Sequence, residues 1–189
     1  MMRSPSNKIT VAALLSAAGL VTGYLESFIV LPVNIPGIRI GLANITTVIA
    51  MYTAGPLYAL IVSSVRVILS SLLFGSPVSF LYSFCGAGLA LAGMMLFKRL
   101  GFSVYGVSVT GAVLHNLAQI SVAFFMVGSG YMFVYMPVLI LTGIAAGLIV
   151  GYLSKILTAR ISFGAGTDRE GRSAVKDNRI PTSDEREGE

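Results

Sequence analysis

Six apolar runs, separated by short breaks rich in proline and glycine, occupy the first 157 residues of this chain. A helix needs about 20 apolar residues to cross the roughly 30 Å hydrocarbon core of a bilayer, because it rises about 1.5 Å per residue. Most of the runs come near that length, and the second is short. We therefore predict an all-α integral membrane protein, a bundle of about six transmembrane helices. The runs cover residues 9–30, 41–54, 56–74, 78–97, 106–127 and 132–157.

Charged residues are few and unevenly placed. They make up 11% of the 189 residues, against about 25% in a soluble domain. Glu26 is the one acidic residue among the first 167. Lysine and arginine concentrate in cytoplasmic loops, so the segments that hold Lys8, Lys98-Arg99 and Lys155 are predicted to lie inside. This orientation makes both chain termini cytoplasmic in a multi-pass protein of the cell membrane.

The chain is predicted to divide at about residue 160. Residues 1–160 form the predicted six-helix transmembrane domain. Residues 161–189 are rich in Gly, Ser, Asp, Glu and Arg and have almost no large apolar side chains. Such a composition cannot bury a core, so this segment is predicted to be a disordered cytoplasmic tail.

The predicted spans, together with the loop before the second one, hold a small set of polar and ionisable side chains. A charged group in a bilayer is costly, so it normally faces a bundle interior or a wet cavity. In the predicted orientation the set falls between the midplane and the outer surface, which predicts a pocket open to the outside. Because guanidinium groups bind carboxylate and phosphate oxygens in pairs, the ligand is expected to be anionic or polar. The predicted substrate-binding residues are Glu26, Arg39, Asn44, Arg66, His115, Asn116 and Gln119.

A structural role for the same residues is the alternative. Arg66 and Glu26 can form an ion pair that joins two helices, and His115, Asn116 and Gln119 can hydrogen-bond neighbouring helices. The set as a whole favours a site, since charge inside a membrane is expensive.

Two helices carry ridges of small residues spaced by four. Ala13 and Ala17 form one in the first helix, and Gly143, Gly147 and Gly151 form another in the last. Such ridges let helix backbones approach closely in lipid. We predict that the glycine ridge packs within the chain and that Ala13 and Ala17 meet an external partner.

The sequence argues against catalysis and against cofactors. No aspartate precedes Asp168, so paired carboxylates that hold Mg²⁺ on a diphosphate are missing from the membrane part. One cysteine, Cys85, and one histidine cannot make a metal site of ordinary ligand count. The phosphate loop G-x-x-x-x-G-K-[ST] does not occur, and the scattered cations form no basic stripe for nucleic acid. We predict a protein that is not an enzyme and has no cofactor, metal or nucleic-acid partner.

Several stretches together resemble one family of membrane proteins. They are P-G-I-R-I-G-L-A-N at 36–44, R-V at 66–67, S-F-C-G-A-G at 83–88, G-A-V-L-H-N-L-A-Q at 111–119 and P-V-L at 137–139. They resemble the Gx transporter family, whose members are often labelled heptaprenyl diphosphate synthase component I. The resemblance covers about residues 9–157.

This family is similar to the substrate-binding S components of energy-coupling-factor transporters, which have six helices. In such systems a membrane T component and cytoplasmic ATPases supply the energy. S components commonly meet the T component through an A-x-x-x-A face on the first helix, so the resemblance implies Ala13 and Ala17 as the partner interface. The synthase label implies an Asp-rich prenyl-transfer site, which this sequence lacks.

Two functional hypotheses follow. The leading one is a lipid-embedded, substrate-binding subunit of an ATP-driven uptake transporter for a small anionic or polar ligand, with a T component and ATPases as partners. The alternative is a non-transporting membrane accessory subunit of a prenyl-lipid or quinone-linked system, in polyprenyl diphosphate synthesis or electron transfer.

Overall fold

The computed structural model describes residues 5–26, 28, 41 and 43–177. Within these residues the chain forms six α-helices and one short 3-10 helix, η1, and contains no strand, which confirms the all-α fold class. The elements are α1 (Pro5–Glu26), α2 (Asn44–Thr53), α3 (Pro56–Phe74), α4 (Pro77–Arg99), α5 (Val104–Val127), η1 (Gly130–Tyr135) and α6 (Met136–Asp177).

The proline and glycine breaks of the sequence become helix boundaries. Pro56 and Pro77 each occupy the first turn of a helix, where the missing N–H has no intrahelical partner to lose. Ser76 caps α4, since its hydroxyl accepts a hydrogen bond of 3.2 Å from the Ser79 N–H. Gly128 ends α5 with a φ of 68°, a left-handed conformation that favours glycine.

Five of the helices in the described residues are long and apolar enough to cross a membrane: α1, α3, α4, α5 and the first part of α6. The sixth, α2, has 10 residues and so rises roughly 15 Å, about half of the hydrocarbon core. The second apolar run therefore does form a helix, but one that covers only part of the membrane.

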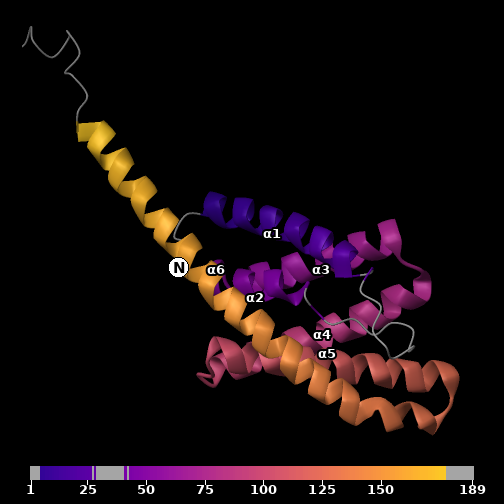
Figure 1. The fold of residues 1–189 in the computed structure, drawn as a ribbon. Helices are drawn as coiled ribbons and strands as arrows, with labels where there is room; N and C mark the ends of the chain where they lie inside the picture. Colours follow the sequence, from indigo (N-terminus) through magenta and orange to yellow (C-terminus); the bar gives the residue numbers. More distant parts are fainter. Residues whose placement is uncertain (1–4, 27, 29–40, 42, 178–189) are drawn as a thin grey trace, which may run out of the picture.

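This short helix lies inside the bundle. α2 contacts α1, α3, α5 and α6, and eight of its ten residues are buried. The long helices enclose it, with α5 packed between α4 and α6. Figure 1 shows α6 crossing the bundle and extending beyond it at its C-terminal end.

Three lysines lie at one end of the bundle, each with its ammonium group over a tyrosine ring. The pairs join the start of α1 to the start of α3, the end of α4 to the end of α2, and the middle of α6 to the start of α5. Because α2 precedes α3 and α4 precedes α5 through short turns, all three pairs share one end. The distribution of positive charge predicts that this end is cytoplasmic. The pairs are Lys8 with Tyr58 at 5.9 Å, Lys98 with Tyr52 at 4.4 Å and Lys155 with Tyr105 at 5.3 Å from the ring centroid.

The glycine ridge of α6 packs within the chain, as the sequence predicts. A Cβ atom added at Gly147 would lie 2.6 Å from the Cα of Val109 in α5, and one at Gly143 would lie 3.3 Å from the Cα of Val113. The two backbones therefore approach so closely that only glycine fits at Gly147 without a shift of the main chain.

The helix α6 continues past residue 160 to Asp177. The sequence has no proline between Pro137 and Pro181, and extending an existing helix costs less than starting a new one. Residues 178–189 lie outside the described part. The division at residue 160 into a membrane domain and a separate tail stays a prediction.

Candidate functional site

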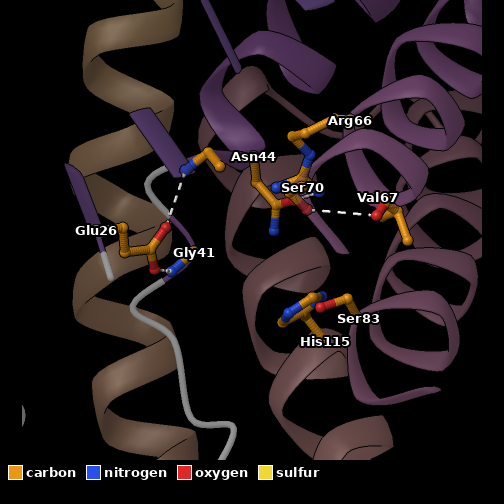
Figure 2. A pocket seen from close by; sticks show the side chains of 9 residues that line it. Glu26, Gly41, Asn44, Arg66, Val67, Ser70, Ser83 and His115 are labelled. Carbon is orange, nitrogen blue, oxygen red and sulfur yellow. Dashed lines mark hydrogen bonds between the residues drawn. The ribbon is translucent and has the colours of Figure 1, made fainter. Parts of the chain in front are cut away.

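A small polar pocket lies where five helices meet. It has a volume of about 20 Å³, which is room for about one water molecule. Figure 2 shows the side chains that surround it. Its lining comes from the end of α1, from the start of α2 with residues just before it, and from α3, α4 and α5: Glu26, Gly41, Ala43, Asn44, Arg66, Val67, Ser70, Ser83 and His115.

Glu26 joins the end of α1 to the start of α2. One oxygen of its carboxylate accepts a hydrogen bond of 2.5 Å from the Gly41 N–H, and the other accepts one of 3.3 Å from the Ala43 N–H (Figure 2). Gly41 has a φ of 84°, a left-handed conformation that is easy only for glycine. A carboxylate at a helix N-terminus is favoured by the helix dipole, so Glu26 stabilises α2 in addition to lining the pocket.

Arg66 brings a guanidinium group to the same pocket from α3. Its Nη2 atom donates a hydrogen bond of 3.2 Å to the Oδ1 atom of Asn44. The aliphatic part of the Arg66 side chain packs on Gly19 of α1, where an added Cβ would lie 3.2 Å from the Arg66 Cδ and 2.8 Å from the Thr46 Oγ1. The glycine in α1 therefore makes room for the arginine.

His115 and Ser83 line the pocket from α5 and α4 (Figure 2). The imidazole ring lies directly over Gly86 of α4, where an added Cβ would be 2.7 Å from Cε1 and 2.8 Å from Nδ1. His115 is 6% exposed. The absence of a side chain at Gly86 thus determines where the ring lies.

The structure brings together four of the seven predicted site residues: Glu26, Asn44, Arg66 and His115 line the pocket. Arg39 lies outside the described residues. Asn116 and Gln119 are buried but are not part of the pocket lining.

The two amides have different surroundings. Asn116 donates a hydrogen bond of 2.8 Å from Nδ2 to the Leu139 carbonyl of α6, so it joins two helices, as the structural alternative proposed. Gln119 is 3% exposed, and within the described part of the chain neither its Oε1 nor its Nε2 has a hydrogen-bond partner. It lies one turn beyond His115 on the same face of α5.

Sequence reasoning missed the backbone groups of the pocket. Gly41 and Ala43 act through their N–H groups, and Gly86 acts by having no side chain, so none carries a polar signature. The run at 36–44 did contain a signal, since a glycine shortly before a helix start is a place where the backbone can turn toward a ligand or a side chain.

A second hollow lies on the outside of the bundle between α1 and α3. It is an apolar groove of about 430 Å³. Ala13 and Ala17 line it and are exposed, whereas the neighbouring ridge of Ser16, Gly19 and Gly23 on α1 is buried. The groove is lined by Ile9, Ala12, Ala13, Ser16, Ala17 and Leu20 of α1 and by Tyr58, Ile61, Val65 and Leu69 of α3.

The family of heptaprenyl diphosphate synthase component I matches residues 15–157, most of the chain and all of the pocket. The chain belongs to this family. Its membership confirms the resemblance noted in the sequence, and the five spans make the chain a multi-pass membrane protein. The word "component" in the family's description names one part of a larger system. No curated protein and no solved structure matches the chain.

Proposed function

We propose that this member of the heptaprenyl diphosphate synthase component I family is the substrate-binding membrane subunit of an ATP-driven uptake transporter. The observation that carries the proposal is the polar pocket inside the bundle, where the Glu26 carboxylate and the Arg66 guanidinium lie among apolar helices. Charged groups at such depth are costly, and in membrane proteins they mark the paths of ligands. A small anionic or polar ligand is the chemistry that Arg66, Asn44 and His115 suit.

The energy for uptake comes from partner proteins in this proposal. The sequence has no phosphate loop, and the S components that the chain resembles rely on a membrane T component and cytoplasmic ATPases. The groove between α1 and α3 supports the same reading, because it is apolar and exposes Ala13 and Ala17. Small side chains let a partner helix in lipid approach the α1 backbone.

Native mass spectrometry of the tagged protein, isolated from its own membranes in gentle detergent, tests both parts of the proposal. The spectrum is expected to show ATPase and T-type subunits together with a bound small molecule. Replacing both Ala13 and Ala17 with Leu fills the groove, so the partners are expected to be lost and the small molecule kept. Replacing Arg66 with Ala is expected to remove the small molecule and to leave the partners bound.

Ala18→Leu is the matched control for the groove. Ala18 is exposed on the same helix but does not line the groove, so the partners should remain. Retention of the partners by the Ala13/Ala17 double variant would contradict the interface. If the spectrum of the unaltered protein shows prenyl-synthase or electron-transfer subunits in place of ATPases, the accessory role is supported and transport is contradicted.

A further inference from the structure

The pocket is too small for an organic ligand in the described conformation. About 20 Å³ holds roughly one water molecule. A ligand can bind there only if one of the lining groups moves.

The backbone at the start of α2 already binds an oxyanion, the Glu26 carboxylate of the same chain. Both oxygens of Glu26 accept hydrogen bonds from backbone N–H groups, at 2.5 Å from Gly41 and 3.3 Å from Ala43. Backbone N–H groups at a helix start bind carboxylates and phosphates from any source. Glu26 is the last residue of α1, and rotation about its side-chain bonds moves the carboxylate without moving either helix.

Asn44, at the start of α2, has a buried amide group that can donate a hydrogen bond to a ligand. Asn44 is 6% exposed, and it lines the pocket (Figure 2). Its Oδ1 accepts the hydrogen bond from Arg66, whereas its Nδ2 has no hydrogen-bond partner within the described residues. A buried amide N–H₂ group without an acceptor is costly, so a ligand oxygen at this point stabilises the site.

We propose that Glu26 occupies the binding position of the ligand's anionic group. A small oxyanion, a carboxylate or a phosphate, takes its place on the Gly41 and Ala43 N–H groups and adds the Asn44 Nδ2 and the Arg66 guanidinium as donors. The Glu26 carboxylate rotates away as the ligand binds, so ligand and side chain compete for one helix end. This inference rests on the proposed function, because it concerns the same pocket.

Binding of simple oxyanions to the purified full-length chain in detergent tests the competition. Sodium acetate and sodium phosphate are titrated separately by calorimetry at constant ionic strength, which is maintained with sodium chloride. Glu26→Gln removes the competing charge, so one of the two anions is expected to bind about tenfold more tightly or better, the factor of one lost charge-assisted hydrogen bond. The anion that gains affinity distinguishes carboxylate from phosphate chemistry.

Two further variants keep the result interpretable. Glu26→Ala is also expected to bind acetate or phosphate more tightly than the unaltered protein does. This second variant provides the measurement if Glu26→Gln does not fold. Ser121→Ala, on α5, removes a hydroxyl that donates to the Leu117 carbonyl and does not line the pocket, so it is expected to leave acetate and phosphate affinity unchanged. Adding Arg66→Ala to Glu26→Gln is expected to remove the gain.

Unchanged or weaker binding of both anions to both Glu26 variants would overturn the inference. So would a gain that survives the loss of Arg66, because the anion would then bind elsewhere. Failure of the transport proposal is a separate result, since it is seen as missing ATPase partners in the mass spectrum and leaves the acetate and phosphate affinities untouched.

Discussion

Glu26 is the one acidic side chain of the membrane part, and its hydrogen bonds go to the backbone. The sequence suggested Arg66 as its structural partner, because the two opposite charges lie on neighbouring helices. The structure instead has both carboxylate oxygens accepting hydrogen bonds from the Gly41 and Ala43 N–H groups, just before α2. Backbone donors exist at every helix start and have no side-chain signature, so this bond could not be found from residue types.

His115 and Asn116 show that sequence also does not determine which neighbouring helix each of two adjacent residues contacts. Both residues were predicted to bind the substrate, but successive residues on a helix point about 100° apart. His115 accordingly faces α4 and the pocket, whereas Asn116 bonds to α6. Sequence could place both residues in the same helix, but not decide which of them faces the pocket.

Replacing Gly86 with Ala tests how the His115 ring is held. The new Cβ would lie 2.7 Å from the ring, so the ring is expected to shift into the pocket. Overfilling a packed site lowers the free energy of unfolding by about 1–3 kcal/mol, to be measured as a lower melting temperature in detergent. Gly88→Ala on the same helix, where no atom lies within 4 Å of the added Cβ, is the control. Equal melting temperatures for the two variants would contradict this packing.

At the scale of elements, α2 is held by opposite charges at its two ends. Glu26 binds the N–H groups at its start, and the Lys98 Nζ donates to the Met51 carbonyl near its end. Both charges have the sign that the helix dipole favours, each by roughly 0.3–1 kcal/mol. A ten-residue helix is marginal alone, and these contacts together with burial among four other helices hold it in place.

Packing between α5 and α6 depends on the glycine ridge. Gly147→Ala places a Cβ 2.6 Å from the Val109 main chain, and because backbone cannot move aside as a flexible side chain can, a loss of about 1–3 kcal/mol in unfolding free energy is expected. Ala145→Val, on an exposed position of the same helix, should change it by no more than about 0.5 kcal/mol. Thermal unfolding in detergent compares them. A loss no larger in Gly147→Ala than in Ala145→Val would mean that the helices are farther apart than described.

For the whole molecule, the orientation predicts which connections face the cytoplasm. A reporter enzyme active only in the cytoplasm is expected to work when fused after Arg99 or Arg160, at the end where the three lysines lie over tyrosines. The same reporter is expected to be silent at Ser76 and Ser129. Ser76 directly precedes α4 and Ser129 follows α5, so both lie at the end of the bundle away from the three lysines. Enzyme activity in intact cells is the measurement. Activity at Ser76 would invert the bundle and place the pocket toward the cytoplasm.

The helices were predictable and the pocket was predictable only in part. Apolar runs and proline or glycine breaks depend on local chemistry, so they located the helices, including the glycine ridge that packs on α5. The pocket depends on which faces meet, and this is determined by tertiary contacts such as Gly19 against Arg66 and Gly86 against His115. Such contacts involve residues far apart in the sequence that leave no joint pattern in a single chain.

The shortness of α2 also has a consequence for how the newly made protein enters the bilayer. Its ten residues are too few to cross the bilayer independently, unlike the long apolar helices on either side. We therefore expect α2 to enter the membrane together with α1 and α3 during synthesis and to be buried when these helices pack around it. In this order of events the pocket, which the start of α2 lines, forms only after the long helices are in the membrane.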